Sequence, residues 1–600
     1  MKKINPVVWT VLAVPVIYMA IVLACAYKAG TNLFALVERF GLLLGRPDLL
    51  RWTAHTPRCI LGVLVCYGLA VTLYYSDREN RRPGEEYGSA RWGNARELNK
   101  QYADPNGKNV ILTKHVSIGL DGYKHQRNLN ILVVGGSGSG KTRFFCKPGI
   151  MSVNCSYLIV DPKGEMLRST GYLLKEEGYD IKVFDLIHPN QSDGYNPFTY
   201  IRDEPDVLKL MDNLVKNTTP PKGASNDPFW EKAEIALDSA LMLYLLSEAP
   251  KDEQNFEMLM FMLECARVME EDDQYQSPLD LLFQSLEERD PTHVAVREYK
   301  VYKQAAGKTA KSILISCGAR LAPFDIPQLR EVMAYDELEL DRIGDRKTAV
   351  FFIISDTTQT YNFLVALAFS QMFNLLCERA DNVHGGRLPH HVRVLWDEAA
   401  NTGQVPQLEK LVAVIRSREV SLCLLYQQLA QCKAIYDKHA ETILGNMDSV
   451  VFLGGREAST IKEISENWLG KATISMQTDS RSRGQSESYS QNTQRLGREL
   501  MTPAELATMP GDKCILQLRG LPPFFSPKYD LKRHPNYRYT AEADKQKNAF
   551  DLDRLINRRR RPGLNEACTM YEVTVPDDAL TEEDEDILNY DDIDDPDAFA

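Results

Sequence analysis

The stretch NILVVGGSGSGKT, from Asn130 to Thr142, constrains the fold of this chain more than any other part of it. Its apolar residues suit a short buried strand, and they run directly into glycines and serines that end in Lys141. This order matches G-x-x-x-x-G-K-[ST], a pattern in which glycines allow backbone N–H groups to point inward at phosphate. A helix that begins after the lysine adds partial positive charge. The stretch therefore predicts a P-loop between a strand and a helix, which indicates an α/β domain.

Each part of this loop has an expected role in holding ATP and Mg²⁺. We expect Lys141 to reach the outer phosphates and Thr142 to offer its hydroxyl to Mg²⁺, while the loop backbone surrounds the phosphates. The residues assigned to nucleotide binding are Gly135, Gly136, Ser137, Gly138, Ser139, Gly140, Lys141 and Thr142. A glycine–serine turn that only precedes a helix is the alternative interpretation.

A second stretch, HVRVLWDEAANTG, supplies the acidic residues that such a loop requires. Val392–Trp396 resembles a buried strand, and Asp397 and Glu398 stand at its carboxyl end. We expect Asp397 to hold the Mg²⁺ shell and Glu398 to polarise the attacking water as a general base. Many strands end at an acid, so this pattern gains its meaning from the P-loop.

Three further polar residues are candidates for the same site. The next predicted strand lies in VSLCLLYQQLAQ and ends at Gln427, whose amide could sense the γ-phosphate; Gln428 is the rival position. The helix QLEKLVAVIRSRE before that strand carries Arg416 and Arg418 near its end. In ring ATPases such an arginine can enter the site of a neighbouring subunit, but solvated charge favoured by the helix dipole is an equal alternative.

Two uncharged runs near the amino terminus predict a membrane anchor. The first lies between Ile4 and Tyr27 and the second between Arg58 and Asp77, and crossing a bilayer takes ~20 helical residues. A cleaved signal peptide is the alternative for the first run. LFALVERFGLLLG lies between them and contains charges, so we expect it outside the bilayer. Because ATP is cytoplasmic, we expect a multi-pass cell-membrane protein with both termini and the catalytic domains in the cytoplasm.

The long interval between the two motifs predicts an inserted domain. DPFWEKAEIALDSALMLYLL and two later stretches show helical spacing, which indicates an all-α insert, whereas TAVFFIIS returns to a buried strand. We expect a membrane anchor at 1–80, the nucleotide-binding domain at 81–202 and 344–540, the insert at 203–343 and a disordered acidic tail at 541–600. The polar stretch from Gln477 is expected to be a flexible loop.

The charge distribution leaves nucleic-acid binding open although the formal net charge is −12. Twelve Asp and Glu and no Lys or Arg lie between Asp577 and the end of the chain, so residues 1–576 are near neutral. A local basic surface on the body is therefore compatible with the composition. The twelve cysteines show no CxxC spacing, which favours buried thiols in a reducing compartment.

Several further stretches complete a recognisable pattern: GSARWGNARE, LIVDPKGEM, YNPF, NDPFWEKA, LWDEAANTGQVPQLEKLVAVIRSREVSLCLLYQQLAQ and LMTPAEL. With them, the chain resembles the TraG-type coupling proteins of conjugation and type IV secretion from about Gly88 to Tyr537. The resemblance implies a RecA-like P-loop domain with an all-α insert and a two-helix anchor. It also implies a hexameric ATPase that recruits relaxase-bound single-stranded DNA, without reading its sequence, and feeds it to the channel subunits of the secretion system.

The same resemblance implies roles for the matched positions. Lys141, Thr142, Asp397, Glu398 and Gln427 fall on the ATPase motifs. DPKGE implies that Asp161, Lys163 and Glu165 line or support the site, although a strand-end turn with a salt bridge is the alternative. An aromatic residue often follows the two acids in this family, whereas this chain has Ala399 at that position. Two other functions stay open: an FtsK/HerA-like DNA translocase, or a recruiting scaffold for secreted protein substrates.

Overall fold

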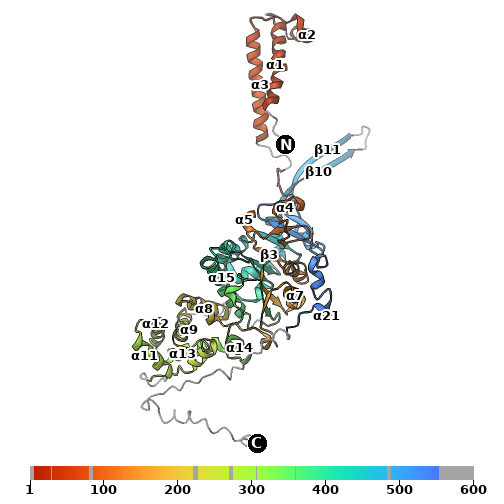
Figure 1. Cartoon of the computed structure of the whole chain (residues 1–600). Helices are drawn as coiled ribbons and strands as arrows, with labels where there is room; N and C mark the ends of the chain where they lie inside the picture. The colour runs from red at the N-terminus through yellow and green to blue at the C-terminus, as the bar shows by residue number, and fades with distance from the viewer. Residues whose placement is uncertain are drawn as a thin grey trace, which may run out of the picture.

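The chain forms an elongated molecule with a helical anchor at one end, an α/β body in the middle and a helical segment at the other end (Figure 1). This computed structural model describes residues 6–552 apart from 29, 31, 80–84, 220–227, 269–274, 306, 359 and 483–487. The acidic run that begins at Asp577 lies outside the described residues, so the expectation of a disordered tail stays a prediction.

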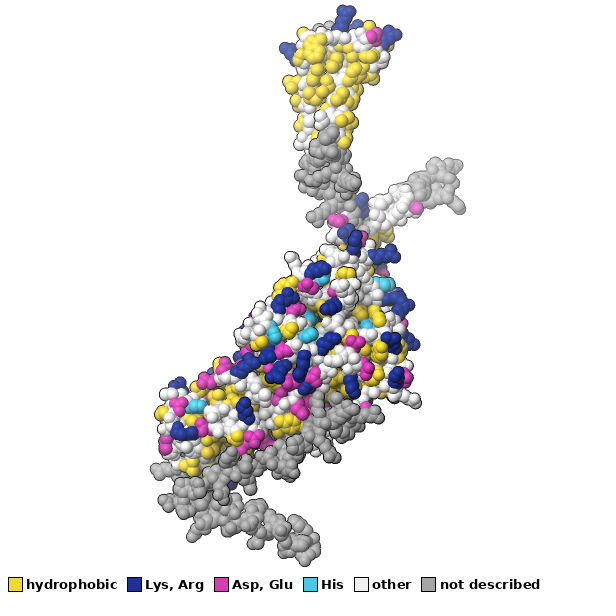
Figure 2. Space-filling view, viewed as in Figure 1, with side chains coloured by type: hydrophobic (Ala, Val, Ile, Leu, Met, Phe, Trp, Pro, Cys, Tyr) yellow, Lys and Arg dark blue, Asp and Glu magenta, His cyan; other side chains and the backbone are white. Residues whose placement is uncertain are grey.

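The anchor consists of α1 (Pro6–Ala26), α2 (Leu33–Leu44) and α3 (Thr56–Glu79). Val8–Ala26 and Thr56–Tyr74 have mean hydropathies of 2.4 and 1.6 and are long enough to cross a membrane. Hydrophobic side chains dominate the surface of these helices (Figure 2). The helix α15 (Phe363–Asn382) is also long and apolar, but it is mostly buried inside the protein, so its apolar residues belong to the core.

The body is built on a nine-stranded sheet in the order β13-β12-β9-β3-β8-β7-β4-β6-β5. Its seven strands from β9 to β5 are parallel, and β12 runs antiparallel to both β9 and β13. The strands are β3 (Ile131–Val134), β4 (Ser156–Pro162), β5 (Asp180–Asp185), β6 (Thr348–Ile354), β7 (Val392–Trp396), β8 (Val420–Tyr426), β9 (Ser449–Phe452), β12 (Lys513–Leu518) and β13 (Phe524–Pro527).

Helices cover both faces of this sheet, which explains why its strands are apolar throughout. Along β3, Ile131 and Val133 join one core cluster, and Leu132 and Val134 join the other, as the alternation of a strand requires. The α-helices of the body are α4 (Ala95–Tyr102), α5 (Gly122–His125), α6 (Lys147–Met151), α7 (Glu165–Glu176), α15, α16 (Leu408–Val414), α17 (Leu429–Tyr436), α18 (Ala440–Gly445), α19 (Ala458–Glu463), α20 (Pro503–Ala507) and α21 (Lys545–Asn548). A small ribbon of β1 (Asn109–Ile111) and β2 (Ser117–Gly119) precedes β3.

Among the described residues, seven α-helices lie between β5 and β6, where the sequence indicates an all-α insert. They are α8 (Glu204–Thr218), α9 (Pro228–Glu248), α10 (Phe256–Glu264), α11 (Pro278–Arg289), α12 (Val294–Lys303), α13 (Gly307–Leu321) and α14 (Pro327–Met333). The first of them, α8, packs against α15 of the body as well as against α9. It therefore joins the helical segment to the nucleotide-binding part of the molecule.

The expectation of a flexible loop from Gln477 is wrong. The chain there forms a long antiparallel ribbon of β10 (Lys471–Ser482) and β11 (Ser488–Glu499), with Ile474 opposite Leu496. The ribbon projects from the body on the side of the anchor (Figure 1). Most of its described side chains are exposed on both faces, so the sequence lacks the apolar alternation that marks a half-buried strand. Backbone pairing between the two strands forms the ribbon, and its base is also bonded to the body, where Thr473 donates its N–H to the Gly88 carbonyl at 3.2 Å.

Candidate nucleotide-binding site

The candidate site lies where three neighbouring parallel strands end. β3 ends at Val134, β7 ends at Trp396, and β8 lies between them and ends at Tyr426. The carboxyl ends of parallel strands share one edge of a sheet, and ligands bind at that edge in open α/β folds. The loops after these three strands carry the residues that the sequence indicates for phosphate, metal and water.

The loop after β3 curls in the way that its glycines predict. Gly135 donates its N–H to the Tyr426 carbonyl (3.1 Å), and Gly136 donates to Gly454 (2.9 Å), so neighbouring strand ends fix the start of the loop. Lys141 is 8% exposed, and its Nζ donates to the Gly135 carbonyl at 3.1 Å. A helical turn begins at Thr142 and continues into α6. The geometry is that of a backbone cradle with a lysine inside it.

Thr142 and Asp397 meet although 255 positions separate them. The Thr142 hydroxyl donates to Asp397 Oδ2 at 2.9 Å. Asp397 is 3% exposed, and burial raises the pKa of its carboxyl above the ordinary range, while the Thr142 hydrogen bond lowers it. The structure thus brings the two predicted motifs together at one point, with a hydroxyl and a carboxylate side by side. That pair is a suitable donor set for Mg²⁺, which prefers few protein oxygens beside phosphate and water.

Glu398 is held in an uncommon backbone conformation by the loop that follows it. Its φ is +51°, in the left-handed region, and its Oε2 accepts a hydrogen bond from Asn401 Nδ2 at 2.8 Å. Asn362, at the start of α15, donates to the Asn401 carbonyl at 2.8 Å. Trp396 Nε1 donates to the buried Thr402 hydroxyl at 2.6 Å. These contacts fix the direction in which the Glu398 carboxylate points.

Gln427 follows β8 directly and lies beside the P-loop. It lines a cavity of about 180 Å³ together with Gly136 and Gln428. Gln428 forms a capping box at the start of α17, whereas Gln427 is exposed. This arrangement leaves the amide of Gln427 available at the edge where phosphate is expected.

The two candidate arginines lie at the other edge of the sheet. Arg416 and Arg418 precede β8, and a seven-residue strand separates them from the P-loop edge by roughly 20 Å. Arg418 forms an ion pair with Asp381 at 2.7 Å, and Arg416 donates to the Gly122 carbonyl at 3.1 Å. The structure therefore does not bring either arginine to the site of its own chain, and a role in a neighbouring subunit stays a prediction.

The DPKGE stretch forms a strand-end turn with ion pairs, as its alternative interpretation expects. Asp161, the second-last residue of β4, accepts from the N–H groups of Met166 and Leu167 at the start of α7. Burial raises the pKa of Asp161 to about 7. Lys163 pairs with Asp356 at 2.5 Å, and Glu165 pairs with Lys147 at 2.6 Å.

Lys528, which no sequence motif indicates, contacts the P-loop from a position 389 residues later in the chain. Lys528 is 6% exposed, donates to the Ser139 carbonyl at 2.8 Å and lies 5.3 Å from the centre of the Phe144 ring. The surrounding sequence, FFSPKYD, holds no motif that could have indicated this contact. The contact of Asn401 with Glu398 was also not predicted, although its position three residues after Glu398 could have indicated it.

The chain is similar to known proteins in its sequence family and in its fold. The model of the family "Type IV secretory system Conjugative DNA transfer" matches residues 91–548. The bacterial conjugative coupling protein TrwBdeltaN70, in complex with sulphate, aligns with a TM-score of 0.54 at 16% identity, over 76% of this chain and 98% of that chain.

Two further structures of the plasmid coupling protein TrwB align similarly. The complex with the ATP analogue ADPNP gives a TM-score of 0.53 at 15% identity, over 76% of this chain and 98% of that chain. The complex with ADP and Mg²⁺ gives 0.51 at 18% identity, over 72% and 91%. No curated protein sequence matches this chain. Since the family model spans most of the sequence, the chain belongs to the conjugative DNA transfer family of type IV secretory systems.

Proposed function

We propose that this chain is a coupling ATPase that uses ATP hydrolysis to drive relaxase-bound single-stranded DNA to the channel of a conjugative type IV secretion system. The observation that carries the proposal is the 2.9 Å contact between Thr142 and Asp397 beside a buried P-loop lysine. Membership of the conjugative DNA transfer family directs that chemistry to DNA and to secretion-system partners.

ATP and Mg²⁺ fit the residues present. The Thr142 hydroxyl and the Asp397 carboxylate would hold the ion, which neutralises charge on the phosphates when bound. Among the described residues, no group of three or more His, Cys, Asp or Glu could hold a metal alone, so nucleotide oxygens and water would complete the shell. Solved coupling proteins of the same fold in complex with ADPNP, and with ADP and Mg²⁺, support this choice of cofactors.

Each chemical role then falls to a residue at the sheet edge. Lys141 leaves the Gly135 carbonyl and binds the outer phosphates. Glu398 takes a proton from the attacking water, and Asn401 holds its carboxylate for that task. Gln427 contacts the γ-phosphate and relays its loss to the surrounding loops. Backbone N–H groups from Gly135 to Thr142 stabilise negative charge without reorganising.

Assembly and location complete the proposal. A homo-hexamer, anchored in membrane lipid by α1 and α3 with its catalytic domains in the cytoplasm, would grip DNA phosphates without reading sequence. Arg416 is the better candidate for entering a neighbouring site, because Arg418 already has the carboxylate partner Asp381. Arg416 forms no ion pair with a carboxylate among the described residues.

A three-variant comparison tests the proposal in the full-length chain. Lys141→Ala should lose ATP binding, because the cradle loses its cation. Glu398→Gln should bind ATP normally and hydrolyse it at least about 100-fold more slowly. Lys175→Ala, an exposed lysine at the end of α7, is the matched control.

The measurements are nucleotide affinity, DNA-stimulated ATP hydrolysis and transfer frequency between cells. Normal hydrolysis by either site variant would exclude this site. Normal transfer with Glu398→Gln would instead support the scaffold function, in which transfer does not require ATP hydrolysis.

A further inference from the structure

The side chain of Asn217 binds the loop that carries Glu398 to α8. Asn217 Oδ1 accepts from the Gln404 N–H at 2.7 Å, and Asn217 Nδ2 donates to the Gln404 carbonyl at 2.8 Å. This two-way contact copies the pairing between adjacent strands, and only a side-chain amide supplies both a donor and an acceptor in that geometry. The loop is thereby fixed to a helical residue that lies 187 positions earlier in the sequence.

The loop between Glu398 and Gln404 is held by close contacts along its length. Gly403 has φ +84°, and a Cβ there would lie 2.4 Å from Asn217 Oδ1, so the loop backbone touches the amide. Two residues earlier, Asn401 holds the Glu398 carboxylate and is itself held by Asn362. A shift of Asn217 would therefore move the loop, and with it the catalytic carboxylate.

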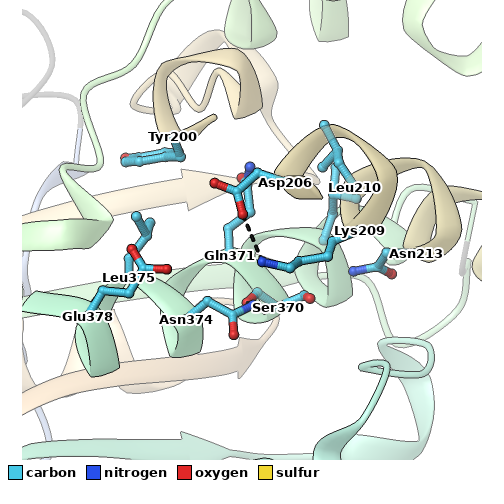
Figure 3. A pocket seen from close by; sticks show the side chains of 11 residues that line it. Tyr200, Asp206, Lys209, Leu210, Asn213, Ser370, Gln371, Asn374, Leu375 and Glu378 are labelled. Carbon is cyan, nitrogen blue, oxygen red and sulfur yellow. Dashed lines mark hydrogen bonds and ion pairs between the residues drawn. The ribbon is translucent and has the colours of Figure 1, made fainter. Parts of the chain in front are cut away.

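The other side of Asn217 is fixed within the body. Its Nδ2 also donates to Asn213 Oδ1 at 2.6 Å, and Asn213 Nδ2 donates to the Ala366 carbonyl of α15 at 3.1 Å. Figure 3 shows Asn213 on α8 facing α15 across a polar pocket. The pocket measures about 30 Å³, which is room for one or two waters and no larger ligand. The contact between α8 and α15 is thus closely packed.

A mostly buried arginine, Arg320, bonds the end of α8 to α9 and α13. Arg320 on α13 donates from Nη1 to the Thr218 hydroxyl at 2.6 Å, one residue after Asn217. Its Nη2 pairs with Glu234 of α9 at 2.6 Å, and the two side chains are only 11% and 3% exposed. A buried ion pair resists separation, because removing one partner leaves an uncompensated charge.

One groove lies between α13, the end of α8 and the loop after β7. It has a volume of about 400 Å³ and is lined by residues that include Asn217, Thr218, Arg320, Asn362, Asn401 and Gly403. Movement of α13 relative to the body would therefore act on the same wall that contains the Glu398 loop.

We propose that Asn217 is a positioning residue that couples the helical segment to Glu398, so that the rate of hydrolysis depends on how α13 sits against α8. The inference deepens the proposed function and rests on it. In this proposal a movement of α13 reaches α8 through Arg320, and it reaches the Glu398 carboxylate through Asn401. Neither Asn217 nor Arg320 is expected to contact the nucleotide.

The test uses single and double variants of the full-length chain with ATP and single-stranded DNA. Asn217→Ala should lower kcat at least about tenfold, since small displacements of a catalytic group are costly, and leave KM and nucleotide affinity within twofold. Asn217→Asp has the same shape but cannot donate to the Gln404 carbonyl, so it should lose as much. Lys216→Ala, at the neighbouring exposed position paired with Asp212, should match wild type.

Two double variants separate coupling from a general loss of structure. Arg320→Ala should lower kcat, and Arg320→Ala with Asn217→Ala should be no slower than the slower single variant within about twofold. Asn217→Ala should have no further effect on hydrolysis when combined with Glu398→Gln. Should the alanine variant fail to fold, the Asn217→Asp variant decides the question.

The outcomes distinguish this inference from the proposed function. Normal hydrolysis by Lys141→Ala would remove the proposed function. An inactive Lys141→Ala together with wild-type kcat in both Asn217 variants would overturn the positioning role alone. Multiplying effects of the Asn217 and Arg320 variants would overturn the coupling.

Discussion

The two loops that meet at the candidate site differ in what holds them. The P-loop, from Gly135 to Thr142, is shaped by its own glycines and by the strand ends beside it. The loop from Asp397 to Val405 is shaped by side chains remote in the sequence, Asn217 and Asn362. A binding loop can thus be built locally, whereas a loop that aims a general base depends on the surrounding fold. The difference predicts that damage to the first loop abolishes binding and damage to the second slows hydrolysis.

The largest effect should come from Gly140→Ala in the P-loop. Gly140 has φ +83°, and a Cβ there would lie 2.4 Å from the Phe144 ring. The left-handed conformation alone costs an alanine roughly 1–2 kcal/mol, and the steric contact adds to it. Nucleotide affinity should fall by at least about tenfold in equilibrium titration, since 1.4 kcal/mol is tenfold. Unchanged affinity would show that the loop is not the phosphate site.

The matching change in the second loop, Gly403→Ala, should separate binding from hydrolysis. Its new Cβ would displace Asn217 Oδ1 and release the loop. We expect kcat to fall about 10- to 100-fold while nucleotide affinity stays within about twofold. Steady-state kinetics and direct titration measure the two quantities. Equal losses of affinity in both glycine variants would remove the contrast between the loops.

Thr402→Val should destabilise the second loop without touching nucleotide. The hydroxyl of Thr402 accepts a hydrogen bond from the Trp396 indole at 2.6 Å, and both groups are buried. An unsatisfied buried donor costs roughly 1–3 kcal/mol. The thermal unfolding midpoint should fall, and added ATP with Mg²⁺ should recover part of the loss by mass action. A midpoint equal to wild type would mean that the loop relaxes without cost.

Lys528→Met, which changes a remote side chain in contact with the P-loop, should have the smallest effect. The variant loses the hydrogen bond to the Ser139 carbonyl but no longer buries a charge, and these two effects oppose each other. Burial already lowers the pKa of Lys528. We expect nucleotide affinity to change by less than about fivefold. A loss as large as that of Gly140→Ala would make the P-loop as dependent on remote contacts as its partner.

Local pattern predicted the strand, glycine and helix order around Lys141, and the acids after Trp396, because each is set by neighbours in the chain. The meeting of Thr142 with Asp397 followed from the rule that parallel strands end together. The hydrogen bonds between Asn217 and Gln404 could not be predicted, since they depend on how α8 packs against the body. The β10–β11 ribbon was missed because its exposed residues show no apolar alternation. The distance of Arg416 and Arg418 from the P-loop follows from their place before β8.

Magnesium-dependent nucleotide binding by Asp397→Asn tests the central claim most directly, namely that the P-loop and the acid of β7 hold one Mg²⁺–triphosphate. ATP affinity would be measured with and without Mg²⁺ for wild type and for this nearly isosteric variant. We predict that Mg²⁺ strengthens binding to wild type and that the variant binds free ATP as well as wild type but loses most of the strengthening by Mg²⁺. An undiminished effect of Mg²⁺ in the variant would contradict the account, because it would place the ion away from the contact between Thr142 and Asp397.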